Sequence, residues 1–172
     1  MRKSEDTTTL INYRSIDPEW ATWSMMNHSE EELRNTYLND PDKVCTTYIC
    51  RYSTLSEDFI EELIVLSTGL FANRPDLYTE SNREFLKKIL FIESIAERSE
   101  YVRNIDLRKV NKENYDFVKE LKLFKGNIRS KVDWWQIANY QNLSREFKIK
   151  FAKKFNEARI RSDNEFARKS VE

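Results

Sequence analysis

Two short groups of carboxylates are the first candidates for acid–base chemistry in this chain. One is a run of three near residue 30, the other lies near residue 60, and together they comprise Glu30, Glu31, Glu32, Asp58, Glu61 and Glu62. A pair of carboxylates can act as general acid and general base, but this spacing singles out no pair. Both groups stand where helices are expected to begin, and the helix dipole favours negative charge there. This local cause is sufficient to explain both groups, and from their charge alone they are also a candidate acidic surface for a partner.

Other side chains that commonly carry out catalysis are sparse. The single histidine, His28, stands directly before an expected helix cap and has no evident partner, so a structural or solvent-facing role is expected. Cys45 and Cys50 are five residues apart, which suits two small residues in or near a core. The two glycines are isolated and cannot form a phosphate-binding loop. We expect no catalytic residue, no metal site and no cofactor, so the chain is predicted not to be an enzyme.

Basic residues near the C-terminus form a second candidate site. Those that could contact phosphates in a non-specific, salt-sensitive way are Lys148, Lys150, Lys153, Lys154, Arg159 and Arg161. Against this role, Phe147, Phe151 and Phe155 recur at i+4 spacing and demand that one face of the same helix be buried. Lysines opposite such a stripe are ordinarily a solvated face.

The composition predicts an all-α fold. Helix formers are abundant, whereas the 172 residues include only two glycines and three prolines. A hydrophobic fraction of 40% is enough for a core. No apolar stretch is long enough to span a membrane, and the first residues lack the apolar run of a secretory signal, so a cytoplasmic location without a membrane partner is expected. We expect an N-terminal segment at 1–15 and one helical domain at 16–172.

Although the net charge is zero, the charges are unevenly distributed along the chain. Residues 1–100 contain 11 Lys and Arg against 19 Asp and Glu, and residues 101–172 contain 18 against 10. The domain thus has an acidic half at 16–100 and a basic half at 101–172. Such asymmetry can mark a surface for a protein or nucleic acid. It can equally let the two halves pack together, or join the basic half of one copy to the acidic half of another.

A repeat links two stretches that are 88 residues apart. VCTTYICRYSTLSEDF begins at Val44, and VDWWQIANYQNLSREF begins at Val132. Six positions match without a gap, and in the second copy they are Val132, Ile137, Tyr140, Leu143, Ser144 and Phe147. The isoleucine and tyrosine are three apart and share a helix face, and the serine then caps a second helix. Each copy is predicted to form helix, tight turn and helix, with the shared apolar and tyrosine positions in the core.

Weaker copies of this unit are predicted elsewhere in the chain. The local signals for helix ends are capping boxes at 29–32 and 81–84, a cap at Asn114 and a left-handed glycine at Gly126. The leading apolar residues of the expected helices are Leu33, Phe59, Phe85, Phe117 and Phe147. Their regular spacing favours about five short helical hairpins stacked in series, each burying a face against the next.

The two adjacent tryptophans of the second copy need separate interpretations. Trp134 lies three residues before Ile137 and extends its apolar ridge. Thr46 and Thr47 occupy the matching positions of the first copy, so the tryptophans are not part of the shared pattern. Tryptophan is usually buried, yet Trp135 is left as an aromatic candidate for binding.

The stretch KVDWWQIANYQNLSREFKIKF resembles a short helix-turn-helix repeat of uncharacterised proteins from bacteriophages and large DNA viruses. The pattern of that repeat is roughly V-D-W-x-x-I-S-x-Y-Q-x-L-S-E-x-F-I, and the residues that match it are Val132, Asp133, Trp134, Ile137, Tyr140, Gln141, Leu143, Ser144 and Phe147. The copy at Val44 matches in part, through Leu55-Ser56-Glu57 and Phe59-Ile60. Both copies together cover about a quarter of the chain. The resemblance implies a viral or mobile-element origin and supplies no catalytic residue.

Binding is therefore the expected class of function, because stacked helix pairs present extended surfaces. With a phage-like origin, the leading hypothesis is a viral effector that binds a host protein and inhibits or redirects it. An inhibitor of a bacterial defence nuclease, such as an anti-CRISPR protein, would fit, with the acidic half approaching the basic nucleic-acid channel. The alternative is a nucleic-acid-binding accessory protein that uses the basic C-terminal helix. Self-association is a third hypothesis.

Overall fold

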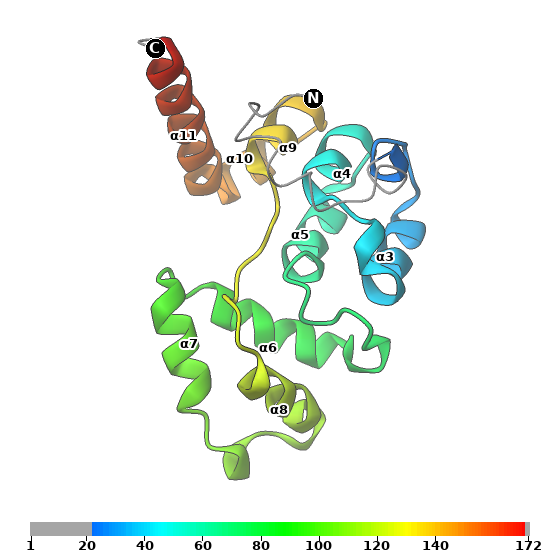
Figure 1. Cartoon of the computed structure of the whole chain (residues 1–172), viewed down its shortest axis with the longest axis vertical. Helices are drawn as coiled ribbons and strands as arrows, with labels where there is room; N and C mark the ends of the chain where they lie inside the picture. Colours follow the sequence, from blue (N-terminus) through cyan, green and yellow to red (C-terminus); the bar gives the residue numbers. More distant parts are fainter. Residues whose placement is uncertain (1–21, 171–172) are drawn as a thin grey trace, which may run out of the picture.

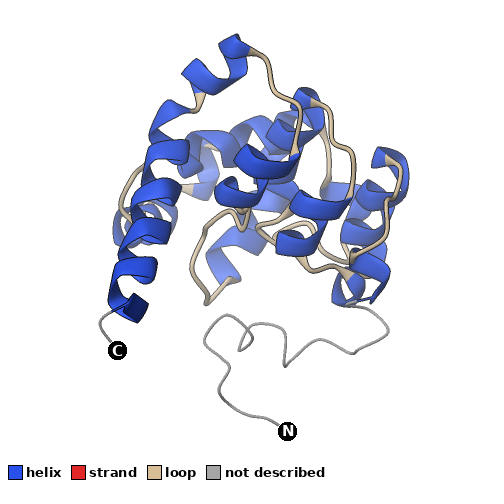
Figure 2. Cartoon of the chain, turned by 90° about the horizontal axis from the view of Figure 1, so that it is seen from above, coloured by secondary structure: helices blue, strands red, loops and turns tan. Residues whose placement is uncertain are grey.

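The structure is a computed structural model in which residues 22–170 are described, so the expected N-terminal segment 1–15 lies outside the described residues. The described part is all-helical, as the composition predicted, and contains no strand (Figure 2). Its α-helices are α3 (Glu30–Asn39), α4 (Thr46–Tyr52), α5 (Glu57–Leu66), α6 (Glu80–Leu90), α7 (Ile95–Arg103), α8 (Tyr115–Leu123), α9 (Trp134–Tyr140), α10 (Arg145–Lys150) and α11 (Ala152–Ser170). Single 3-10 turns are η1 (Pro41–Lys43), η2 (Pro75–Leu77), η3 (Leu107–Lys109) and η4 (Lys112–Asn114).

The helices divide between two ends of the molecule (Figure 1). Helices α3, α4 and α5 lie at one end with α9, α10 and α11, whereas α6, α7 and α8 lie at the other. The chain returns from α8 to α9 through the extended segment 124–133. A contiguous hydrophobic core joins both ends and includes fully buried Leu33, Phe59, Leu86, Phe117 and Ile137. None of the described helices is long and apolar enough to cross a membrane.

Serine caps begin the helices at the places where the sequence predicts them. The hydroxyls of Ser29, Ser56 and Ser144 each accept a hydrogen bond from the backbone N–H three residues later. Such a bond satisfies one of the N–H groups that a helix start leaves without a partner. The two copies of the 88-residue repeat therefore both form helix, turn and helix, as α4–α5 and α9–α10. Helices α4 and α9 pack directly against each other, while the stacking of about five units in series stays a prediction.

Three predicted helix ends are wrong. Thr79, not Ser81, caps α6 by accepting from Asn82 N at 3.1 Å. Asn114 precedes α8 but does not cap it, because its side chain donates instead to Ser81 Oγ and Asn82 Oδ1, both at 2.9 Å. Gly126 does not have a positive φ; among the described glycines, Gly69 does, at 79°. Ser81 and Asn114, which were expected to cap helices, instead bond to each other in a polar network that includes buried Asn82.

The single helix that was expected to carry Phe147, Phe151 and Phe155 is interrupted. Helix α10 ends at Lys150, and α11 begins at Ala152 after a turn at Phe151. The change of direction lets two of these rings meet Trp134, with centroids 5.0 Å away for Phe151 and 5.4 Å away for Phe155. Of the aromatic stripe that was predicted to be buried, Phe147 is buried, whereas Phe151 and Phe155 are partly buried against the core.

Candidate partner-binding surface

The aromatic residues of the second repeat copy divide into framework and surface. Trp134 stacks on the aromatic stripe described above, and Ile137 is fully buried. Trp135 is 39% exposed and Tyr140 is 46% exposed. The two lie five residues apart on α9, which places them about 140° apart around the helix. Trp135 and Tyr140 therefore lie on different faces of α9.

The repeated tyrosine is a surface residue in both copies, so its predicted place in the core is wrong. Tyr52 is 37% exposed, Tyr140 is 46% exposed, and Ile49 and Ile137 beside them are fully buried. Both tyrosines converge on one guanidinium, because Arg51 Cζ lies 5.0 Å from the centre of the Tyr52 ring and 4.7 Å from that of Tyr140. These distances are within the range of cation–π attraction. We call Arg51, Tyr52 and Tyr140 the Tyr–Arg surface.

The helices that carry this surface are unusually poor in charge. Charged residues make up 34% of the chain, yet the sequences of α4, TTYICRY, and α9, WWQIANY, contain only one charge, Arg51. Centres of protein interfaces are depleted of charge and enriched in tyrosine, tryptophan and arginine. The packing of α4 on α9 also favours few charges, so this composition is compatible with an interface centre and with packing inside the chain.

Gln141 holds the two repeat copies in this arrangement. Its Nε2 donates to Cys50 O at 2.9 Å and Ser53 O at 2.7 Å, and its Oε1 accepts from Leu55 N at 2.9 Å. The second copy thereby satisfies three backbone groups around the turn of the first. These partners are 86 to 91 residues away in the sequence, so no local pattern around Gln141 indicates the bonds.

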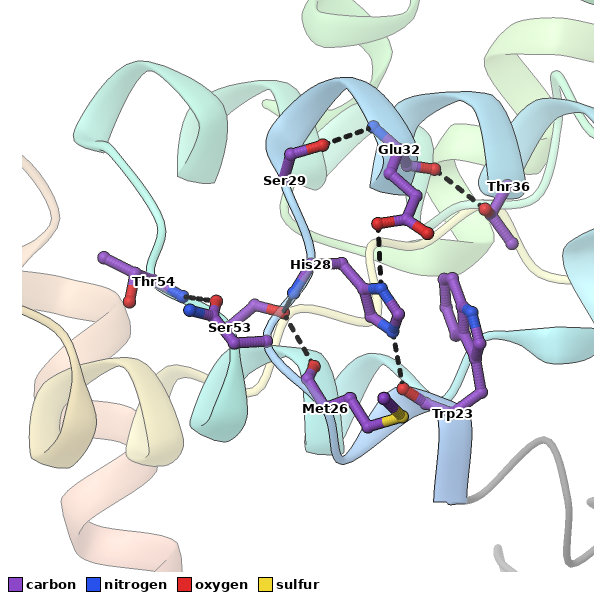
Figure 3. Close-up of polar contacts among 9 residues, drawn as sticks. Trp23, Met26, His28, Ser29, Glu32, Thr36, Ser53 and Thr54 are labelled. Atoms are coloured by element: carbon purple, nitrogen blue, oxygen red, sulfur yellow. Dashed lines mark hydrogen bonds and ion pairs between the residues drawn. The ribbon is translucent and has the colours of Figure 1, made fainter.

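The turn of the first copy is fixed on its other side by His28 and its neighbours (Figure 3). Ser53 lies at the position that matches Gln141, and its hydroxyl accepts from His28 N at 3.2 Å. The buried His28 ring is bonded at Nδ1 to Glu32 Oε1, 2.9 Å away, and donates from Nε2 to Trp23 O at 2.7 Å. It also stacks on Trp23, with ring centroids 3.8 Å apart. The expected structural role of His28 therefore has a specific form, and its partner Glu32 was not foreseen.

Most of the candidate acidic residues make contacts within the chain. Glu30 accepts from Ser56 N at 2.6 Å, Glu32 is bonded to His28, and Glu61 pairs with Lys150 at 3.1 Å. Glu31 and Asp58 are exposed and form no ion pair or hydrogen bond with the described residues. The six carboxylates therefore do not form one free acidic surface.

Glu62 is the most strongly held of these carboxylates. Arg34 donates to it from Nε at 2.5 Å and from Nη2 at 2.7 Å, and the Tyr78 hydroxyl donates at 2.5 Å. Burial alone would raise the pKa of Glu62, but the hydrogen bonds from Arg34 and Tyr78 outweigh burial and lower this pKa. Burial and the bond to Glu62 raise the pKa of the Tyr78 hydroxyl. The cluster joins α3, α5 and the segment before α6.

The lowered pKa of Glu62 predicts a loss of stability in acid. A carboxyl with a folded-state pKa below its unfolded value stabilises the fold above the unfolded pKa, and this contribution disappears as the pH falls through the folded one. Between about pH 5 and pH 3, the wild type should therefore lose stability more steeply than Glu62→Gln in urea denaturation. The matched control is Glu31→Gln, whose pH profile should follow that of the wild type. Parallel profiles for wild type and Glu62→Gln would contradict the prediction.

The candidate basic residues also serve partly as internal contacts. Lys150 pairs with Glu61, Lys153 with Glu93, and Arg159 with Asp163. Lys154 helps to lower the pKa of Glu93 after the larger effects of Lys153. Lys148 and Arg161 are exposed and form no ion pair with the described residues. The charge asymmetry therefore contributes to packing between the two halves, which was one of the interpretations left open.

The described residues offer no group of three or more His, Cys, Asp and Glu side chains that could hold a metal ion. Cys45 and Cys50 are both free and buried, as expected for small core residues. Burial raises the pKa of the Cys50 thiol to about 12, which disfavours the reactive thiolate.

Comparisons with known proteins identify no relative: no family model, curated protein or solved structure matches the chain. The resemblance of 132–147 to a repeat of phage and viral proteins therefore stays a prediction.

Proposed function

We propose that this chain is a non-enzymatic effector that binds a host protein through the Tyr–Arg surface and inhibits or redirects it. One observation carries the proposal. Of the positions shared by the two repeat copies, the isoleucines are fully buried, and the serines cap helices. The tyrosines instead remain exposed in both copies and meet at Arg51. The tyrosines neither fill the core nor cap a helix, and their exposed rings with Arg51 between the two copies fit a binding surface.

The viral setting of the proposal comes from the resemblance of the repeat. A host protein is the natural target of such an effector, and a bacterial defence nuclease, as for an anti-CRISPR protein, is the target class we favour. Exposed Glu31 and Asp58 could add contacts to basic residues of that target. The alternative is a nucleic-acid-binding accessory protein, and exposed Lys148 and Arg161 favour it because neither is paired within the described residues.

The test is capture of host proteins from bacterial lysate by the tagged chain, with and without nuclease treatment. The wild type should retain a stoichiometric protein that survives nuclease. The double variant Tyr52→Ala/Tyr140→Ala should retain less than about a tenth of it, because exposed aromatic residues at interface centres dominate binding energy. Both positions are partly exposed, so the variant should still fold, which circular dichroism would check.

Tyr115 provides a matched control for these substitutions. It is 40% exposed and has a cation over its ring, Lys119 Nζ at 5.5 Å from the centroid, but it lies on α8 at the other end of the molecule. Tyr115→Ala should leave capture unchanged. Capture that is independent of Tyr52 and Tyr140 would contradict the proposed surface. Recovery of only nuclease-sensitive material would favour the basic alternative.

A further inference from the structure

Arg51 has no acidic partner among the described residues, and this property limits the kinds of ligand that the Tyr–Arg surface can bind. Among the described residues, no carboxylate pairs with Arg51 and no acceptor is hydrogen-bonded to its guanidinium. Aromatic faces attract the cation but leave its five N–H donors for an acceptor outside the chain. The surrounding rings also restrict the side chain, so less entropy is lost when an acceptor is bound.

Because Arg51 is the one charged residue of α4 and α9, it favours a single carboxylate over a nucleic acid as the acidic partner. A nucleic acid is held through several phosphates at once, each neutralised by a lysine or arginine. Helices α4 and α9 supply one cation and no acidic residue, which suits a single anionic group flanked by apolar atoms. A guanidinium binds a carboxylate through two parallel hydrogen bonds. The two tyrosine rings beside the guanidinium offer apolar contact area.

We propose that the Tyr–Arg surface receives an aspartate or glutamate side chain of a protein partner, with apolar neighbours of that residue packed on Tyr52 and Tyr140. This inference rests on the proposed binding role of the surface and adds the chemistry of the contact. Arg51 supplies the specificity for a carboxylate, and the two tyrosines supply most of the contact area.

The experiment uses two peptides that differ in one functional group, acetyl-Leu-Glu-Leu-amide and acetyl-Leu-Gln-Leu-amide, added at millimolar concentration to the isotope-labelled full chain. The Nε–Hε signal of Arg51, assigned from its absence in Arg51→Gln, and the ring signals of the two tyrosines are followed by NMR. The glutamate peptide should shift these signals saturably and bind about tenfold more tightly than the glutamine peptide. Arg51→Gln should abolish that difference.

Each of the other outcomes would overturn the acidic assignment. Equal shifts with both peptides, or no shift at Arg51, would mean that no carboxylate is recognised. Shifts of the same size at Lys119 and Tyr115 would mean only a general attraction of peptide to exposed cations. Larger shifts of the Arg51 signal with hexathymidylate than with the glutamate peptide would assign the surface to nucleic acid. Protein capture that is lost in Tyr52→Ala/Tyr140→Ala would still support the proposed binding function, even if the peptide experiment showed no carboxylate recognition or only a general attraction to cations.

Discussion

Replacing Arg98 with methionine should lower the free energy of unfolding by about 3 kcal/mol. Arg98 is buried in α7 and donates to three backbone carbonyls: Ile92 O at 2.6 Å, Ile128 O at 2.7 Å and Leu90 O at 3.0 Å. Leu90 is the last residue of α6, and the carbonyl end of a helix attracts a cation. Ile128 belongs to the segment that returns from α8 to α9. Methionine fills a similar volume but leaves all three carbonyls without this donor.

A competing cost makes this prediction informative. Burial lowers the pKa of Arg98, so keeping this cation in the interior is itself unfavourable, and replacement of buried charges by apolar residues is sometimes stabilising. We expect the hydrogen bonds to win because three are made at once with short distances. Urea denaturation would measure the effect, with Arg103→Met, an exposed arginine of the same helix, within about 0.5 kcal/mol of wild type. An Arg98→Met protein as stable as wild type would show that burial of the charge cancels its bonds.

The helix class and many helix starts could be predicted because their causes are local. A serine whose hydroxyl reaches the N–H three residues later needs no distant partner, so Ser29, Ser56 and Ser144 were correctly placed as caps. The cap of α6 failed for the opposite reason. Asn82 is buried, donating to Leu77 O at 2.8 Å and accepting from Asn114. This network between elements that are distant in sequence moves the helix start to Thr79.

The candidate site was predicted less well than the fold. Helical periodicity indicates which way a side chain points, but not how deeply it is buried. Tyr140 follows Ile137 by three residues and lies beside it on α9, at the edge of the buried face. Whether such an edge position is covered depends on what packs there, and the packing of α4 on α9 leaves both tyrosines partly exposed. Arg51 was not singled out at all, since an isolated arginine in sequence has no visible partner. The repeat itself was the signal, because it identified Tyr52 and Tyr140 as equivalent.

Replacing Gln141 with methionine should cost about 2–4 kcal/mol of unfolding free energy, although Gln141 is a polar residue in a turn. Its amide bonds to the two carbonyls and the one N–H of the first repeat copy, and each of those groups is partly buried around the bond. Methionine preserves length and volume but provides neither donor nor acceptor. The free energy lost is therefore that of three backbone groups left without a partner, rather than that of a lost apolar contact.

The residue next to it supplies the control for this substitution. Asn142 is exposed in the same turn, so Asn142→Ala should stay within about 0.5 kcal/mol of wild type. Hydrogen exchange gives a local readout as well, because the Leu55 amide donates to Gln141 and should exchange faster in Gln141→Met under native conditions. Unchanged protection of Leu55 with unchanged stability would mean that packing of α4 on α9 alone joins the two copies. Loss of both the stability and the protection of Leu55 would show that the Gln141 side chain holds the two copies together and so keeps Tyr52 and Tyr140 beside Arg51.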